Sequence, residues 1–335
     1  MYCKTCGLPV PDTARFCGNC GTKVESHAYR KPLSAPPVPS ASPSPRRTSR
    51  NGAMTFGLSL FLIVLVVVFE IIGYAIAGLT GLDADLMITL FGALGAVLSI
   101  IILGGISLLR PNASKLLRAW KEGWWCIAVS VGLSGYDIVM TLASGETLVT
   151  EGWLLRTLGV LLLCLAVGAS EEAVFRGLVL NGALDAFGKK KIGIVLVSVI
   201  VSIGFGAAHV VWGDLDYSDP LSILQAVLKT IQTGTYGFFL AALTIRTGDL
   251  VGPMLLHAFD DFFLMLPSVG LYGETVTTEY VHSGEDAIPT IMLYVIIILL
   301  YLPLVWRGVK LLIETTAPQR GAFHKETTDL QAKTA

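Results

Sequence analysis

Residues 153–188 read WLLRTLGVLLLCLAVGASEEAVFRGLVLNGALDAFG, an apolar run that three lysines follow. At about 1.5 Å per residue, a helix of this length exceeds the roughly 30 Å of hydrocarbon in a bilayer. The stretch therefore predicts one tilted transmembrane helix, with Glu171 near mid-depth. Ionisable side chains at that depth cost roughly 2.5–3.5 kcal/mol each on insertion scales, so Glu171, Glu172 and Arg176 are interpreted as functional.

Apolar runs of spanning length continue outward on both sides of this stretch. The chain is 53% hydrophobic and 15% charged, a composition typical of membrane proteins. The other candidate spans are 54–79, 86–109, 124–143, 192–212, 221–245, 250–271 and 287–306. The sequence therefore predicts an all-α polytopic membrane protein with about eight transmembrane helices.

The loops between these spans alternate in charge. One set carries the basic residues Arg110, Lys115, Arg118, Lys121, Lys189, Lys190, Lys191, Arg246, Arg307 and Lys310. The other set has only acids, namely Asp83, Asp85, Glu146, Glu151, Asp214, Asp216, Asp219, Glu274, Glu279, Glu285 and Asp286. Basic loops stay in the cytoplasm, so we expect a multi-pass protein of the cell membrane with both termini cytoplasmic.

Four regions differ in composition. Residues 1–25 are rich in cysteine, and residues 26–50 are rich in Pro, Ser and basic residues, with few large apolar ones. The second region should be a disordered linker, because it cannot bury enough surface to offset its ordering entropy. The membrane domain is expected at 54–307, and residues 308–335 should form a loosely ordered polar cytoplasmic tail.

The first region has the spacing of a zinc ribbon. Two Cys-x2-Cys pairs, Cys3 with Cys6 and Cys17 with Cys20, can place four thiolates around one structural Zn²⁺. Disulfides are disfavoured, because the predicted topology places this module in the reducing cytoplasm. The module carries few basic residues, so a protein partner or substrate presentation is favoured over nucleic acid.

Three motifs in separate apolar runs carry the polar chemistry: EEAVFR at 171–176, FGAAH at 205–209 and HAFDD at 257–261. Glu172 and Arg176 are i, i+4 on a helix and can form a structural ion pair. Glu171 points elsewhere, and burial suits it to act as a general base. The alternative is that both Glu residues only lock neighbouring helices through Arg176.

His209 and His257 are the histidines of the second and third motifs. His257 and Asp261 are i, i+4, so the carboxylate can orient the imidazole or share a ligand with it, while Asp260 faces another direction. His209 alone would usually be a hydrogen-bonded core or interfacial histidine, and a polar helix–helix clamp is the alternative for the HAFDD motif. Counted along straight helices, His257 lies about 16 Å from the cytoplasmic edge and His209 about 27 Å. Tilt, or a break at Gly204 or Gly206, must bring them together.

In this order and at membrane depth, the motifs resemble those of the CPBP intramembrane proteases, which include type II CAAX prenyl endopeptidases and bacteriocin-immunity relatives. The resemblance covers about 120–270. It implies a metalloendopeptidase in which Glu171 and His209 activate a water molecule, while His257 and position 261 hold a metal or stabilise the oxyanion. The prenyl-protein enzymes usually carry Asn there, and Asp261 favours metal binding instead. Glu171, His209, His257 and Asp261 could therefore hold a second Zn²⁺, or they could activate a water molecule without a metal.

Substrates would be membrane-associated proteins or peptides, prenylated or not, met within the lipid. Two other classes of function use the same residues. A proton-coupled transporter or channel could relay protons through the buried acids and histidines. A non-catalytic immunity or scaffold protein would use the ribbon to bind partners. Lys229, in the 221–245 run, is expected to make a helix–helix contact.

Overall fold

The computed structural model describes residues 51–276 and 279–323, together with Val10, Ala14, Phe16, Thr22 and Lys23. The chain divides into two compact units, Met1–Thr48 and Ser49–Ala335. In the first unit, Phe16 and Lys23 form an isolated antiparallel bridge. The predicted zinc ligands Cys3, Cys6, Cys17 and Cys20, and the predicted linker 26–50, lie outside the described residues.

The described part of the second unit consists of helices and loops. The α-helices are α1 (Gly52–Phe61), α2 (Ile63–Thr80), α3 (Ala84–Leu103), α4 (Ala113–Ser144), α5 (Trp153–Glu172), α6 (Asn181–Phe187), α7 (Lys191–Ala207), α8 (Pro220–Thr247), α9 (Val251–Met265) and α10 (Ala287–Glu314). Two π-helices, η2 (Ala173–Leu180) and η4 (Leu266–Tyr272), follow α5 and α9. Short 3₁₀ turns are η1 (Ile106–Leu109), η3 (Trp212–Asp214) and η5 (Gly284–Asp286). The predicted all-α polytopic membrane fold is confirmed.

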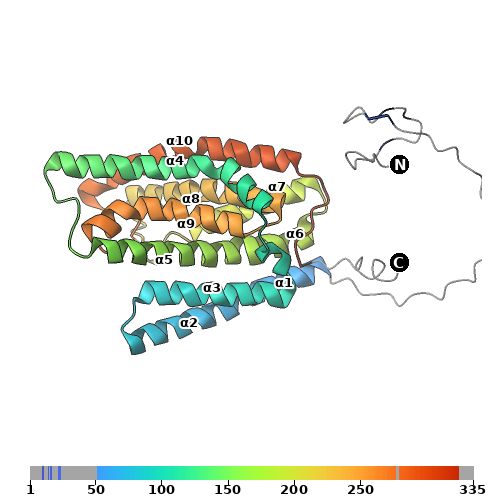
Figure 1. Ribbon diagram of the computed structural model, residues 1–335, viewed down its shortest axis with the longest axis horizontal. Coiled ribbons are helices and arrows are strands. Elements are labelled where there is room, and N and C mark those ends of the chain that lie inside the picture. The colour runs from blue at the N-terminus through green and yellow to red at the C-terminus, as the bar shows by residue number, and fades with distance from the viewer. Residues whose placement is uncertain are drawn as a thin grey trace, which may run out of the picture. The chain divides into compact units, whose positions relative to one another are not determined.

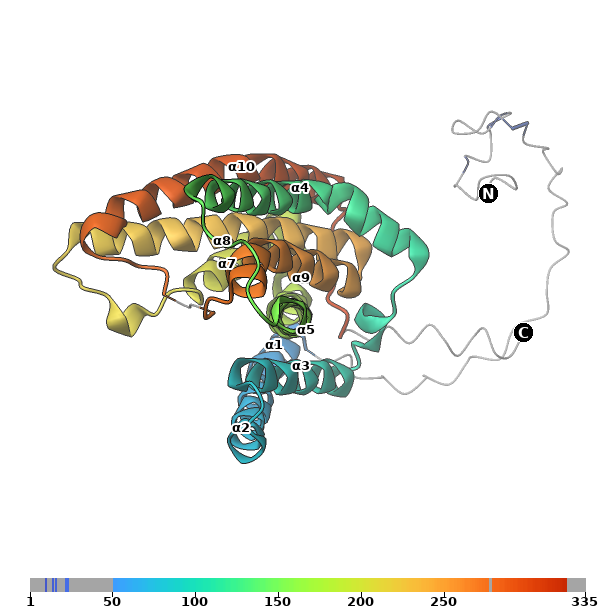
Figure 2. The ribbon, with the colours of Figure 1, turned by 60° about the vertical axis from the view of Figure 1, so that its left-hand side comes forward.

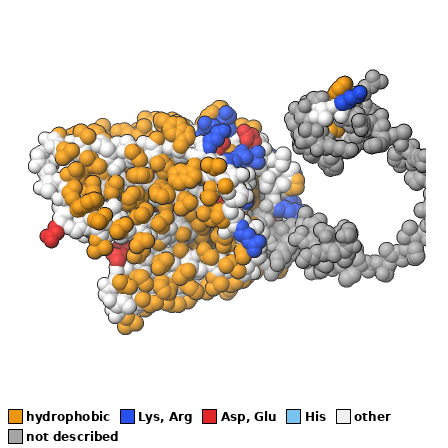
Figure 3. Space-filling model, viewed as in Figure 1, with side chains coloured by type: hydrophobic (Ala, Val, Ile, Leu, Met, Phe, Trp, Pro, Cys, Tyr) orange, Lys and Arg blue, Asp and Glu red, His pale blue; other side chains and the backbone are white. Residues whose placement is uncertain are grey.

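Six helical stretches of the described residues are long and apolar enough to cross a membrane. They are Gly52–Thr80, Ala84–Leu103, Ala113–Ser144, Trp153–Phe187, Val251–Tyr272 and Gly284–Glu314. Of the two remaining predicted spans, α7 has only 17 residues, and α8 has 28 but includes Gln225, Lys229 and Gln232. Eight spans therefore remain a prediction. Apolar side chains cover the face seen in Figure 3, and its Lys and Arg residues gather near one end.

The helices pack in pairs that determine where the polar motifs lie. Helix α5 packs against α9 and α3, α4 packs against α9, and α8 packs against both α7 and α10. The α2–α3 hairpin lies on the outside of the bundle, with α3 between α2 and α5 (Figures 1 and 2). This arrangement brings α5, α7 and α9, along which the polar motifs lie, and their neighbour α8 around one interior region.

Two glycines allow the close helix contacts on which this region depends. A Cβ at Gly168 would lie 2.5 Å from the carbonyl oxygen of Met254, so α5 and α9 touch backbone to backbone just before Glu171. A Cβ at Gly206 would lie 2.1 Å from the carbonyl oxygen of Thr230, so α7 and α8 touch in the same way just before His209. Any larger residue at either position would separate the helices that hold the site.

Two boundaries differ from the sequence prediction. Helix α7 ends at Ala207, before the expected end at 212, and His209 lies in the turn that follows. Helix α10 continues to Glu314, and the chain then folds back onto the bundle, where the Ala322 N–H donates to Asn181 Oδ1 at 2.9 Å. Phe323 is only 2% exposed. The expected polar tail from 308 is therefore part of the membrane domain as far as 323, because Phe323 completes an apolar cluster.

Candidate functional site

The Glu pair lies where α5 changes its winding. Helix α5 ends at Glu172, and the backbone continues without a gap as the π-helix η2 and then as α6. The stretch 153–187 is thus the single long helix that the sequence predicts, with a wider turn after the two carboxylates. π-helical turns are rare and are frequent at functional sites, because they re-aim the side chains around them.

Glu172 and Arg176 form a fully buried ion pair. Arg176 Nη1 donates to Glu172 Oε1 at 2.7 Å, and neither side chain has exposed surface. Arg176 Nη2 donates to the carbonyl oxygen of Gly237 on α8 at 3.0 Å, and the guanidinium lies over the Phe205 ring at 4.1 Å. The pair predicted from i, i+4 spacing therefore also joins α5 to α7 and α8.

The same carboxylate orients a histidine. Glu172 Oε1 lies 2.9 Å from His257 Nδ1, and His257 is 3% exposed. A carboxylate accepts hydrogen bonds, so Nδ1 carries the proton, and Nε2 points to the other side of the ring. The sequence suggested that Asp261 could do this. In the structure, Asp261 Oδ2 instead lies 3.4 Å from Nε2, so Asp261 shares the side of the ring that faces Glu171.

His209 is held in an equivalent way. Its Nδ1 lies 2.9 Å from the carbonyl oxygen of Phe205 in the last turn of α7. Because a carbonyl can only accept, Nδ1 donates and the neutral ring presents a lone pair at Nε2. The buried Phe205 ring contacts the rings of His209 and His257 with centroid distances of 4.8 and 5.8 Å. Phe205 thus supports both imidazoles and Arg176 at once.

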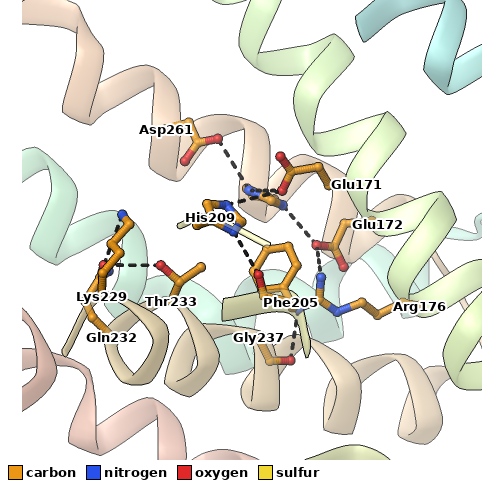
Figure 4. Close-up of polar contacts among 11 residues, drawn as sticks. Glu171, Glu172, Arg176, Phe205, His209, Lys229, Gln232, Thr233, Gly237 and Asp261 are labelled. Carbon is orange, nitrogen blue, oxygen red and sulfur yellow. Dashed lines mark hydrogen bonds and ion pairs between the residues drawn. The ribbon is translucent and has the colours of Figure 1, made fainter. Parts of the chain in front are cut away.

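The polar atoms converge on Glu171, as Figure 4 shows. Glu171 Oε2 lies 3.6 Å from His209 Nε2 and 3.8 Å from His257 Nε2, and it makes no hydrogen bond. The side chains of Glu171, Asp261 and His209 are 32%, 30% and 20% exposed, whereas those of Glu172 and Arg176 are closed off. Glu171, Asp261 and His209 are therefore partly exposed. The fully buried Glu172 and Arg176, which we call the sealed layer, orient His257. Such a convergence of acceptors suits a bound proton donor or cation.

Asp260, the neighbour of Asp261, belongs to a different contact. The Tyr301 hydroxyl donates to both oxygens of Asp260, at 3.0 and 2.9 Å, and Asp260 is 3% exposed. This bond ties α9 to α10 behind the site. Asp260 therefore faces away from Glu171, in the direction that the helical spacing predicts.

The side chains at the site are of the types that commonly bind zinc. Two imidazoles have Nδ1 tied to acceptors and present Nε2 beside two carboxylates, which is how zinc-binding histidines are commonly supported. Within the described ranges, however, no group of three or more His, Cys, Asp or Glu side chains is arranged to hold a metal ion. A metal at this position remains a prediction.

Three parts of the site are not predicted from the sequence. The sequence marks Phe205 only as the start of a motif, although its ring supports Arg176 and both histidines. The other two parts are the Gly237 carbonyl and the Tyr301 hydroxyl. A backbone acceptor leaves no signal in the sequence. The position of Phe205, four residues before His209, is the one clue that could have indicated the ring contact.

Comparison with known families gives two matches. Residues 152–263 match the model of the type II CAAX prenyl endopeptidase Rce1-like family, and residues 2–24 match a zinc-ribbon domain. The first match begins at the start of α5 and includes Glu171, Glu172, Arg176, His209, His257 and Asp261. No curated protein and no solved structure matched the chain. The chain is therefore similar to the Rce1-like family over residues 152–263 and to a zinc-ribbon domain over residues 2–24.

Proposed function

We propose that this chain, with its Rce1-like CAAX prenyl endopeptidase domain, is an endopeptidase that hydrolyses membrane-associated proteins or peptides within the bilayer. One observation carries the proposal. Two imidazoles with fixed tautomers turn Nε2 toward the Glu171 oxygen that makes no hydrogen bond. A water molecule among these acceptors would be both bound and activated, which is the requirement for hydrolysis.

In the proposed reaction, Glu171 takes a proton from the water, and the water oxygen forms a bond to the scissile carbonyl carbon. The electron pair of the carbonyl moves onto its oxygen. When the tetrahedral intermediate collapses, the C–N bond breaks, and Glu171 returns the proton to the leaving amine. The products are one carboxylic acid and one amine. His209 and His257 orient the water through Nε2, while Glu172, Arg176 and Phe205 hold the imidazoles in place.

The orientation in the membrane follows from the charged loops. We propose that the end rich in Lys and Arg faces the cytoplasm, since basic loops are retained there. Both ends of the membrane domain then lie on that side, together with the zinc ribbon. A ribbon with four cysteine ligands has no open position for chemistry, so it would bind a protein partner or present substrate.

The proposal is tested by hydrolysis in reconstituted liposomes. The purified chain is incubated with a library of prenylated and unprenylated peptides in H₂¹⁸O, and the products are identified by mass spectrometry. We expect cleavage with one ¹⁸O in each new carboxylate. His209→Ala should lower the rate by about 10²-fold or more, because the water loses an orienting acceptor.

His282→Ala is the matched control, because this histidine contacts the bundle through its backbone and lies in the loop before α10. It should cleave like the wild type. Cleavage by His209→Ala at the wild-type rate would contradict the site assignment. If the wild type cleaves no peptide, while protons or ions cross the liposome membrane, the transporter alternative replaces the protease.

A second zinc ion is part of the proposal. His209 and His257, with Glu171 or Asp261, would hold it through the Nε2 atoms that would otherwise accept directly from the water, and it would supply a Lewis acid that polarises this water. We expect two zinc ions per wild-type chain by elemental analysis of the dialysed protein. Replacing Cys3, Cys6, Cys17 and Cys20 by Ser should leave one, and adding His257→Ala should leave none. If the chain without the four cysteines already contains no zinc, the membrane site works without a metal.

A further inference from the structure

Lys229 is a charged residue inside the bundle that the proposed reaction does not yet use. It lies on α8, and its Nζ donates to Gln232 Oε1 at 3.3 Å. The same ammonium lies 3.9 Å from the centre of the Tyr280 ring and 5.8 Å from that of Tyr294. No carboxylate oxygen of the described residues is within 4.0 Å of it. An ammonium at membrane depth is costly, so its retention among neutral partners needs an explanation.

Several hydrogen bonds fix the residues around Lys229 in place. The Gln225 side chain clamps the backbone of His282, with Nε2 donating to the carbonyl at 2.8 Å and the N–H donating to Oε1 at 2.9 Å. The Tyr294 hydroxyl donates to the carbonyl oxygen of Tyr280 at 2.5 Å. The loop before α10 is thereby fastened to α8 and α10, and it holds the Tyr280 ring over the ammonium. A cation over a tyrosine face is stabilised without losing its charge.

The position of Lys229 relates it to the open side of the site. Figure 4 shows the side chain rising from α8 on the side where His209 and Asp261 lie. Arg176, by contrast, lies in the sealed layer and is already neutralised by Glu172.

A cation at this position could stabilise the negative charge that develops on the carbonyl oxygen of the substrate. When Glu171 takes the proton from water, its negative charge is transferred to the carbonyl oxygen of the substrate, close to the second carboxylate, Asp261. An ionised Asp261 cannot stabilise that charge, because it only accepts hydrogen bonds. An ammonium directed at the developing oxyanion would stabilise it, most strongly in a site of low dielectric constant.

We propose that Lys229 is a further catalytic residue, whose ammonium binds the oxyanion of the tetrahedral intermediate. The ammonium stays protonated throughout, so the proton transfers remain those of Glu171 and water. The carbonyl electron pair that moves onto oxygen is stabilised until the C–N bond breaks. Asp261 then balances the ammonium before substrate binds. This inference rests on the proposed peptidase function.

The test compares kcat, KM and the melting temperature of the full chain in liposomes, using the peptide that the wild type cleaves best. Lys229→Met should lower kcat by about 10²- to 10³-fold and change KM by less than about threefold, as the loss of an oxyanion donor does. Lys229→Arg should retain more activity than Lys229→Met. Lys310→Met, the same change on an exposed residue of α10, should behave as the wild type.

A second substitution separates catalysis from charge balance. In the Lys229→Met background, Asp261→Asn removes a carboxylate and adds an N–H donor, so kcat should rise at least about tenfold above that of Lys229→Met alone. A Lys229→Met protein with normal kcat, or with raised KM and unchanged kcat, would overturn the inference. The second result would assign Lys229 to an anion on the bound substrate. A wild type that cleaves nothing would instead overturn the proposed function, and this inference with it.

Discussion

Glu171→Gln is expected to reduce kcat for peptide hydrolysis by about 10²- to 10⁴-fold while leaving KM close to the wild-type value. Glutamine has the shape of glutamate and can still contact His209 and His257, so the substrate meets an almost unchanged site. It cannot accept a proton from water at neutral pH. The loss should therefore appear in the chemical step, measured by single-turnover cleavage of the peptide that the wild type prefers.

The same substitution should not destabilise the protein. Glu171 Oε2 lies within 3.8 Å of two imidazole nitrogens and makes no hydrogen bond. The position of this carboxylate therefore suits the reaction and does not stabilise the fold. Replacing such a group often raises stability, because active sites keep unfavourable arrangements that their chemistry requires. We expect an unchanged or higher melting temperature for Glu171→Gln.

Glu146→Gln makes the same chemical change at an exposed residue in the loop after α4, and it should alter neither kcat nor the melting temperature. If Glu171→Gln retains more than about a tenth of the wild-type kcat, another residue must act as the general base. Asp261, which also faces His257 Nε2, would be the next candidate.

Spacing within one helix allowed part of this site to be predicted. The i, i+4 rule identified Glu172 with Arg176 and separated Asp260 from Asp261, because helical geometry alone fixes which side chains share a face. The apolar pattern likewise indicated the long helix through residues 153–188. Both features depend on local chemistry, which a single sequence contains.

The meeting of three helices could not be derived in this way. Counting rise along straight helices placed His209 and His257 at depths about 11 Å apart. The structure brings both within reach of Glu171, because α7 ends at Ala207 and His209 lies in the following turn. Where a helix stops inside an apolar run depends on its partners, here the close α7–α8 contact at Gly206.

The sequence also does not show which residues form hydrogen bonds between different helices. Asp261 was a reasonable candidate to orient His257, yet Glu172 on another helix does so. A buried carboxylate oxygen that already accepts from Arg176 has a second lone pair available, and only the packing of α5 on α9 brings His257 to it. Orientation of a catalytic group by a residue elsewhere in the chain requires the tertiary structure.

Arg176→Met is expected to cost roughly 3–5 kcal/mol of unfolding free energy, because it leaves the fully buried Glu172 carboxylate without its cation. It should also abolish hydrolysis, since Arg176 joins Glu172 to the Gly237 carbonyl and stacks on Phe205. The measurement is unfolding in mixed micelles with increasing SDS, followed by far-UV circular dichroism.

Arg307→Met is the matched control for this change. Arg307 pairs with Glu122 at 3.6 Å, but its side chain is 48% exposed, so the loss should stay below about 1 kcal/mol. If Arg176→Met costs no more than Arg307→Met, the buried pair contributes nothing that an exposed pair does not, and Arg176 would have no structural role.

The double substitution Glu172→Met with Arg176→Met separates stability from function. Replacing both members of a buried ion pair by apolar residues of similar volume is often neutral or stabilising, so most of the lost unfolding free energy should return. Hydrolysis should not return, because His257 Nδ1 would lose the carboxylate that fixes its tautomer and aims Nε2 at Glu171. Recovery of both properties would show that the pair serves only the fold. Recovery of stability alone would show that Glu172 and Arg176 serve to orient His257. That role would explain why a membrane protein keeps two charges in its core.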